Sequence, residues 1–428
     1  MWTKQLTFLK SILDLSLLIG YSEIVEPQYK LERIKNMNEQ ALREKVVNYM
    51  KKMAEIEWTP EKTFISFNPG NVGTKMLSIF RAGTTYYGLP YINFNMAEAE
   101  TFDLWRHDTY IPFSGTEEQL NSIQKTADLI AIGGEILDSS VKNAFSFPGN
   151  DCIAAVLMAW NTVINNRPEI QKMQTVSSTV PGKNTGVIAV GDYDYSNTFD
   201  DNTDEMTKAN DKQTMARAYS LLKPADAVVY IRKNNGNARH IRLVAELPHI
   251  EYTVNESGDE TIDTEKSYIT ILDQAGGAAV RFIKGENYSS FHFEKYTYDE
   301  LYEEGSLPIS IPELCVEGAY KEEKTVIEGL EYKNGKFNGN VKTNRQLIAL
   351  RAVVSDGEKQ YDCPGNVVMT GKDIPTNYHL GEYDLNKLDI SALPTPSPDK
   401  EYSFNLYVIT SGNDGMETQL VSDYRFKG

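Results

Sequence analysis

The stretch that decides the fold is FPGNDCIAAVLMAW, residues 147–160. Gly149, Asn150 and Asp151 favour a turn followed by a helix N-cap. The residues after Cys152 are almost all apolar and leave no polar stripe, which predicts a helix that is buried on every side. We take this helix as the centre around which the rest of the chain is organised.

Cys152 lies in the first turn of this predicted helix. Unpaired backbone N–H groups and the helix dipole stabilise negative charge there, and such conditions favour a nucleophilic thiolate over a thiol. The alternative is a small buried cysteine that packs as a hydrophobic residue. This stretch alone leaves both interpretations open, and the choice depends on residues further along the chain.

The composition indicates a globular protein with more than one domain. The chain has 428 residues, of which 41% are hydrophobic and 24% charged, and this length suits two or three domains. A formal net charge of −17 argues against a nucleic acid partner and against an electrostatic anchor on anionic membranes. The sequence has no run of about 20 apolar residues, so we predict no membrane span.

Three cysteines are too few for a disulfide framework, and no pair has the spacing of a zinc site. A Cys315–Cys363 bridge would leave Cys152 as the odd thiol. The acidic loop 192–205 lacks the glycine and the glutamate that a calcium loop requires, so we interpret it as a solvated loop. We predict no cofactor and no metal.

The N-terminal region is expected to be helical. Residues 1–25 carry apolar periodicity, and we expect 1–35 to be an N-terminal helical segment. Asp14 and the lack of a small-residue cleavage site count against a signal peptide. A second helix is expected to start at an Asn38 cap and to end near Pro60, where proline stops propagation.

The remaining residues divide into a main domain, 36–314, and a C-terminal domain, 326–428. Within the main domain, residues 93–145 mix polar loops with helical pieces and are interpreted as an insertion. In the C-terminal domain, residues 346–354 and 402–410 alternate apolar and polar side chains between turn signals. This pattern predicts an all-β, immunoglobulin-like sandwich.

A hairpin after the buried helix places a histidine near an acid. A strand is predicted over 227–231, and its return strand starts at His240 after an Asn- and Gly-rich turn. The next predicted strand ends with Asp273-Gln274. A thiolate, an imidazole that shuttles the proton and a polar group that fixes the imidazole tautomer form a nucleophilic site for acyl chemistry.

The sequence resembles the NlpC-type cell-wall peptidases and their CHAP amidase relatives, which share a papain-like fold. The resemblance covers roughly residues 40–300. It rests on five short segments that match the family pattern: Gly88-Leu89-Pro90-Tyr91, Asp151-Cys152, Leu222-Lys223-Pro224-Ala225-Asp226-Ala227-Val228-Val229-Tyr230, His240-Ile241-Arg242-Leu243-Val244 and Thr270-Ile271-Leu272-Asp273-Gln274.

Three features depart from the family pattern. Ile153-Ala154 replaces the usual Ser-Gly after the nucleophile, and Ala225 replaces the glycine of the usual Pro-Gly-Asp. The segment between Tyr91 and Cys152 is also longer than usual, which predicts a remodelled substrate groove.

The resemblance implies an α+β, papain-like domain whose buried Cys helix packs on an antiparallel sheet. It implies a Cys152–His240–Asp273 site, with Gln274 and His249 as rivals for the third residue. Tyr87, Tyr91 and Asp151 are expected to contact substrate, whereas Arg242 is expected at the surface. His107, His292 and His379 are interpreted as incidental.

The implied activity is hydrolysis of amide bonds in peptidoglycan peptides, in an extracellular or cell-wall location. Two alternatives stay open. The first is a transglutaminase-like acyl transferase, and the second is a catalytically idle papain-like module that binds glycopeptide.

Overall fold

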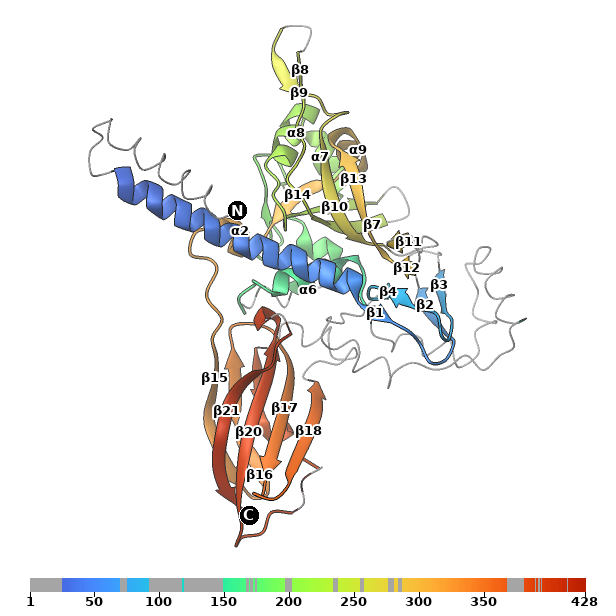
Figure 1. Ribbon diagram of the computed structural model, residues 1–428. Helices are drawn as coiled ribbons and strands as arrows, with labels where there is room; N and C mark the ends of the chain where they lie inside the picture. The colour runs from blue at the N-terminus through green and yellow to red at the C-terminus, as the bar shows by residue number, and fades with distance from the viewer. Residues whose placement is uncertain are drawn as a thin grey trace, which may run out of the picture. The chain divides into compact units, whose positions relative to one another are not determined.

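A computed structural model shows a mixed helix and sheet protein with antiparallel sheets, compatible with the α+β class (Figure 1). The chain divides into two compact units, Met1–Leu42 and Arg43–Gly428. The structure describes residues 25–69, 75–91, 118, 149–166, 169, 172–173, 175–196, 202–233, 238–254, 258–275, 281–283, 287–367, 381–388, 390–391, 393, 395–413 and 415–428. The predicted insertion 93–145 therefore lies, apart from Glu118, outside the described residues.

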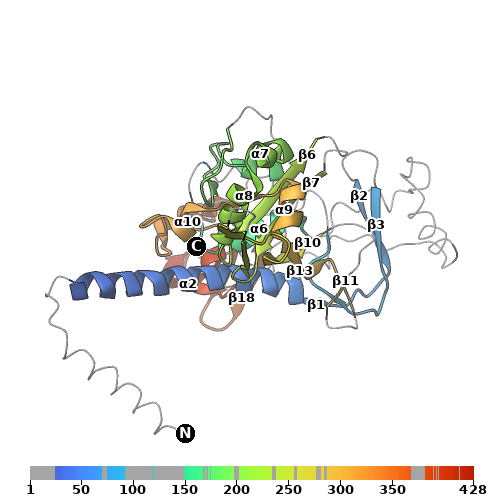
Figure 2. The ribbon, with the colours of Figure 1, turned by 90° about the horizontal axis from the view of Figure 1, so that it is seen from above.

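Helix α2 (Val25–Glu55) is one unbroken helix in Figure 2. The predicted cap at Asn38 is wrong, because Asn38 lies inside the helix. The boundary drawn at residue 35 likewise falls within α2 rather than between two elements. The part of α2 that belongs to the second unit has buried side chains at helical spacing: Val46, Met50 and Met53.

A six-stranded antiparallel sheet forms the centre of the second unit, in the order β13-β10-β7-β6-β14-β5. Its strands are β5 (Ile188–Ala189), β6 (Ala227–Arg232), β7 (Ala238–Val244), β10 (Tyr268–Gln274), β13 (Phe291–Thr297) and β14 (Leu307–Ser310). The predicted β6–β7 hairpin is confirmed, with Tyr230 opposite His240. Asp273 and Gln274 are the last two residues of β10, so the predicted strand end is confirmed.

Helix α6 (Cys152–Asn161) contacts β7 and β10 of this sheet. All ten of its residues are buried, as the absence of a polar stripe predicted. Near its C-terminus, Trp160 Nε1 donates a 2.8 Å hydrogen bond to the carbonyl of Ala225. Ala225 has φ of +77°, a left-handed conformation that favours glycine. An alanine therefore occupies a strained backbone conformation at this position.

The other helices of the main domain are short. They are α7 (Thr203–Ala209), α8 (Lys212–Ser220), α9 (Tyr298–Glu304), α10 (Pro312–Cys315) and the 3-10 turn η4 (Val176–Thr179). Four two-stranded ladders complete this part of the chain, and the β8–β9 ladder extends away from the central sheet (Figure 1). The ladders are β1 (Glu57–Trp58) with β4 (Tyr86–Tyr87), β2 (Phe64–Pro69) with β3 (Lys75–Phe80), β8 (Tyr252–Val254) with β9 (Glu260–Ile262), and β11 (Arg281–Ile283) with β12 (Asn287–Ser289).

A buried ion pair joins α2 to the start of β6. Arg43 Nη1 lies 2.8 Å from Asp226 Oδ1, and the same guanidinium donates to the carbonyls of Pro224 and Leu314. Ser310 Oγ donates a further hydrogen bond to the Asp226 carboxylate. Burial nevertheless raises the pKa of Asp226, and the Arg43 charge, the Ser310 hydroxyl and the backbone N–H of Lys223 oppose that rise.

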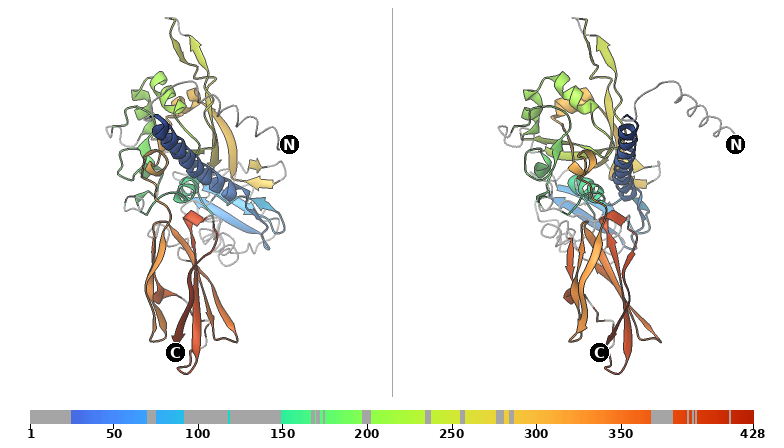
Figure 3. Two further views of the ribbon diagram at one scale, coloured as in Figure 1. Left: turned by 60° about the vertical axis from the view of Figure 1, so that its left-hand side comes forward. Right: turned by 90° about the vertical axis from the view of Figure 1, so that its left-hand side faces the viewer.

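The C-terminal domain consists of a three-stranded and a four-stranded antiparallel sheet, which form two layers in Figure 3. The first has the order β15-β16-β19 and the second β18-β17-β20-β21. Their bounds are β15 (Thr325–Lys333), β16 (Lys336–Thr343), β17 (Leu347–Ser355), β18 (Gln360–Val367), β19 (Glu382–Asp384), β20 (Glu401–Thr410) and β21 (Thr418–Lys427), with the 3-10 turns η6 (Leu385–Lys387) and η7 (Ser411–Asn413).

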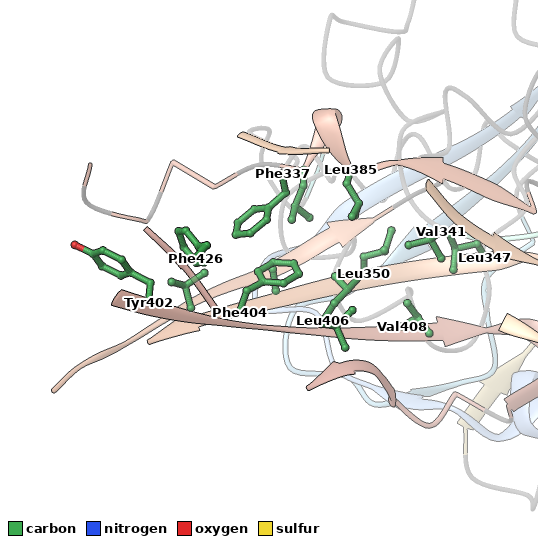
Figure 4. Close-up of a cluster of buried hydrophobic side chains, with 14 residues drawn as sticks. Phe337, Val341, Leu347, Leu350, Leu385, Tyr402, Phe404, Leu406, Val408 and Phe426 are labelled. Atoms are coloured by element: carbon green, nitrogen blue, oxygen red, sulfur yellow. The ribbon is translucent and has the colours of Figure 1, made fainter. Parts of the chain in front are cut away.

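One hydrophobic core lies between these two sheets (Figure 4). Phe337 from β16 stacks on Phe404 from β20, with ring centroids 4.0 Å apart, and Phe426 from β21 packs edge-on against Phe337. Strand β20 alternates buried and less buried residues along its whole length. The predicted alternation is therefore confirmed for 402–410. In β17 it begins only at Leu350, because residues 347–350 are all buried.

The C-terminal domain is hydrogen-bonded to the end of α6. Ser411 Oγ donates to the carbonyl of Asn161 at 2.8 Å, and the Asn161 amide donates to Gln346 Oε1. Arg345, which is 1% exposed, donates to Asn165 Oδ1 at 2.8 Å just beyond the helix. These contacts are buried and polar, so each unpaired group would be costly.

Among the described residues, no helix has both the length and the apolarity needed to cross a bilayer. Cys315 Sγ donates a hydrogen bond to the carbonyl of Ile311. The side chain of Cys363 lies outside the described residues, so the Cys315–Cys363 bridge that the sequence left open stays open.

Candidate active site

Cys152 is the first residue of α6 and is 4% exposed. Asp151 is the N-cap, with extended backbone, and its side chain accepts a 3.0 Å hydrogen bond from the N–H of Ala154. This cap fixes the start of the helix and leaves the sulfur next to unpaired backbone N–H groups. The predicted substrate contact of Asp151 is not tested by this geometry, which gives the side chain a capping role.

His240 and Asp273 face each other across β7 and β10. His240 Nε2 lies 2.9 Å from Asp273 Oδ2 and 2.7 Å from Oδ1, and the carboxylate is 2% exposed. Burial disfavours the charged imidazole, but the carboxylate of Asp273 and the nearby Cys152 outweigh it and raise the pKa of His240 well above 6.5. The carboxylate of Asp273 thus favours the charged imidazolium form of His240.

Asp273 is the complementary charge of this pair. Its burial favours the neutral acid, but His240 and then Arg242 lower the pKa of Asp273 below 3.8. The two shifts have opposite signs, as expected for a buried carboxylate–imidazolium pair.

The thiol of Cys152 is hydrogen-bonded to the His240 ring. Because Nε2 is engaged by Asp273, Nδ1 is the ring nitrogen left for the sulfur. The structure thus places thiol, imidazole and carboxylate in one chain of contacts, in the order that proton transfer from sulfur to nitrogen requires.

Tyr91 also reaches the sulfur. Its hydroxyl is hydrogen-bonded to Cys152, and a parallel bridge joins its backbone to Asn150. Burial, followed by the electrostatic interactions with Cys152, Asp151 and Asp273, raises the pKa of Tyr91 well above 10. The hydroxyl therefore stays protonated and acts as a neutral hydrogen-bond donor beside the thiol. Of the two predicted substrate tyrosines, Tyr91 lies at the site, whereas Tyr87 is half-buried in β4 opposite Glu57.

Arg242 lies behind the carboxylate, and its expected place at the surface is wrong. It is 5% exposed, and its Nε lies 3.5 Å from Asp273 Oδ2. Nη1 and Nη2 pair with the two oxygens of Glu304 at 2.5 and 2.9 Å, and the guanidinium lies over Tyr296 with 4.3 Å to the ring centroid. The β7–β10 register explains the burial, because it continues from Leu272 opposite Leu243 to bring Arg242 beside Asp273.

His292 is a second histidine at the carboxylate. It lies opposite Asp273 in the β10–β13 register, with Nε2 3.4 Å from Asp273 Oδ2 and 3.2 Å from Glu294 Oε2. His292 therefore lies at the site, although the sequence interpretation had treated it as incidental. The sequence holds no signal for it, because the pairing partner of β13 depends on a non-local register. His107 and His379 lie outside the described residues.

The two rivals of Asp273 do not contact His240 in this arrangement. His249 is exposed and pairs with Glu251 at 3.1 Å. Gln274 is fully buried, but successive side chains in a strand point to opposite faces, and its amide donates to Asn150 Oδ1 at 2.8 Å.

Within the part of the chain that the structure describes, no group of three or more His, Cys, Asp or Glu side chains is arranged to hold a metal ion. Comparison with family models, with curated proteins and with solved structures finds no match to this chain.

Proposed function

We propose that this protein is a cysteine hydrolase that cleaves amide bonds in peptidoglycan peptides through Cys152, His240 and Asp273. One observation carries the proposal: a thiol at a buried helix N-terminus is hydrogen-bonded to a histidine whose other nitrogen is held by a 2%-exposed carboxylate. A histidine that served packing alone would need neither neighbour.

The chemistry follows from these contacts. His240 holds the thiol proton, and the thiolate attacks the carbonyl carbon, which becomes a tetrahedral oxyanion. The Tyr91 hydroxyl and the backbone N–H of Cys152 are the donors next to that oxygen. Collapse breaks the C–N bond while the imidazolium protonates the leaving amine. Water then attacks the thioester with His240 as base, which releases the acid and regenerates the thiol.

The fold and the setting belong to the same proposal. The resemblance to NlpC-type peptidases suggests a papain-like main domain, an immunoglobulin-like C-terminal sandwich and an extracellular or cell-wall location. The buried helix on an antiparallel sheet and the two-layered C-terminal domain support the first two. Peptidoglycan as substrate rests on the resemblance.

An acyl transferase of transglutaminase type is the second candidate. The same thioester can pass to an amine instead of water, and transfer requires a site that limits access of water. The 4% exposure of Cys152 is the observation that favours it. The idle glycopeptide-binding module is the third candidate, and the intact set of contacts around Cys152 weighs against it.

Digestion of purified peptidoglycan distinguishes the three. Wild type, Cys152→Ala and Cys315→Ser are incubated with and without an acceptor amine, and fragments are read by mass spectrometry. Cys315→Ser is the matched control, since it removes an exposed thiol away from the site. New amine ends made by wild type and Cys315→Ser alone support the hydrolase. Acceptor-linked products indicate the transferase, and binding without turnover leaves the module.

A further inference from the structure

We propose that Gln274 is a positioning residue that sets Cys152 and Tyr91 against His240. The inference rests on the proposed function, because it assigns a role within the same site. Gln274 is 0% exposed and forms hydrogen bonds through both ends of its amide.

The Gln274 amide joins two segments that are distant in sequence. Its Nε2 donates to the carbonyl of Leu89 at 3.1 Å, to the carbonyl of Asn150 at 3.2 Å and to Asn150 Oδ1 at 2.8 Å. Its Oε1 accepts a 2.7 Å hydrogen bond from Ser290 Oγ, and Ser290 also donates to Leu89 at 3.2 Å. Three oxygens therefore face the NH2 group, which fixes the orientation of the amide.

Each of these segments carries one member of the site. Leu89 is two residues before Tyr91, and Asn150 is two residues before Cys152. The N–H of Asn150 donates to the carbonyl of Pro90 at 3.1 Å, so the segments also pair with each other. A displacement of either segment would move the Tyr91 hydroxyl or the Cys152 sulfur.

The location of Gln274 in β10 explains why it has this effect. Its neighbour Asp273 holds His240 from one face of the strand, while Gln274 holds the Leu89 and Asn150 segments from the other. Two consecutive residues of one strand thus position the base, His240, and the segment that carries the nucleophile, Cys152. Misplacement of reacting groups by about 1 Å can lower a rate by about 100-fold, so this shared reference matters for reactivity.

The test measures alkylation of Cys152 by iodoacetamide across pH in the full chain, with modification read at the Cys152 peptide by mass spectrometry. Gln274→Glu turns an oxygen towards three acceptor oxygens, and Gln274→Met removes the donors at similar volume. We expect both to lower the rate by about 10- to 100-fold in folded protein and to alter its pH profile. A residue that only supports the fold would lower the melting temperature and leave the native rate unchanged.

Ser290→Ala is the matched control, because it removes the Ser290 hydrogen bonds to Gln274 Oε1 and to the carbonyl of Leu89 but keeps the three oxygens that accept from Gln274 Nε2. It should stay within about threefold of wild type, a factor that corresponds to less than one ordinary hydrogen bond. Rates for both Gln274 variants within twofold of wild type, with an unchanged pH profile, overturn the proposal. Should both variants lose the fold, Asn150→Ala removes one acceptor, and an unchanged rate there overturns it equally.

The readout is independent of the substrate. Slowed alkylation in the Gln274 variants supports the positioning role even where wild-type protein leaves peptidoglycan intact, in which case only the proposed hydrolase fails. If the wild type cleaves peptidoglycan but alkylation is unaltered in the Gln274 variants, the proposed hydrolase stands and the positioning role fails.

Discussion

Replacing Asp273 with asparagine should destabilise the folded protein by about 3 kcal/mol near pH 5–6. The carboxylate is 2% exposed and lies 2.7–2.9 Å from His240 Nε2. Loss of one member of a buried ion pair costs about 3–5 kcal/mol, and unit charges about 4 Å apart interact by about 4 kcal/mol at an effective dielectric constant of about 20. Asparagine keeps a hydrogen-bond acceptor for His240, so we expect a cost at the lower end of the 3–5 kcal/mol range, about 3 kcal/mol.

The pH dependence of this cost follows from the two pKa shifts. The pKa of His240 is raised above 6.5, so its contribution is complete below about 6.5 and is lost as the pH rises through the folded value. The pKa of Asp273 is lowered below 3.8, so its contribution is present above about 3.8 and is lost as the pH falls through the folded value. The difference between wild type and Asp273→Asn should therefore be greatest between these limits.

Urea unfolding at a series of pH values measures the difference, and NMR titration of the histidine rings, with His240→Gln for assignment, locates the loss of the His240 proton. Asp211→Asn is the control: it changes an acid to an amide at an exposed helix cap, where asparagine caps equally well. The pKa of Asp211 is also lowered, so Asp211→Asn should change the free energy of unfolding only at acidic pH, where the aspartate would be protonated. A cost for Asp273→Asn that stays constant through the deprotonation of His240 would refute the ion pair.

Three further predictions concern stability and domain structure. Ala225→Gly should raise the free energy of unfolding by about 0.5–1 kcal/mol, because it relieves the φ of +77°; a lower value in urea unfolding contradicts this. Arg43→Met should cost about 3–5 kcal/mol by leaving Asp226 buried without its cation, and a cost below 1 kcal/mol would show that the pair is dispensable. Limited proteolysis in the mostly exposed segment 316–324 should give fragments that co-elute in size-exclusion chromatography, since the α6 contacts remain; immediate separation argues against that interface.

Local signals predicted much of the site. The apolar run after Asp151 is sufficient to predict a buried helix with Cys152 at its start, since capping and burial depend on neighbouring residues. The Asn- and Gly-rich turn before His240 likewise predicts the β6–β7 hairpin. These inferences use only the period of the pattern and its turn residues.

Register and partners could not be predicted in the same way. The burial of Arg242, the contact of His292 with Asp273 and the turning of Gln274 away from His240 all depend on how β7, β10 and β13 align. A shift of one residue would exchange the two faces of a strand, and no local pattern fixes that alignment. The start of α2 at Val25 was missed because an asparagine inside a helix resembles a cap in sequence.

The attachment of the C-terminal domain to α6 has a mechanical consequence. Asn161, the last residue of the helix, is hydrogen-bonded to Ser411 and Gln346, while Cys152 is the first residue of the same ten-residue helix. A ten-residue helix is about 15 Å long and is stiff along its axis. A force applied to the C-terminal domain would therefore be transmitted along α6 to Cys152. A mechanical load on one domain would in this way displace the thiol in the other.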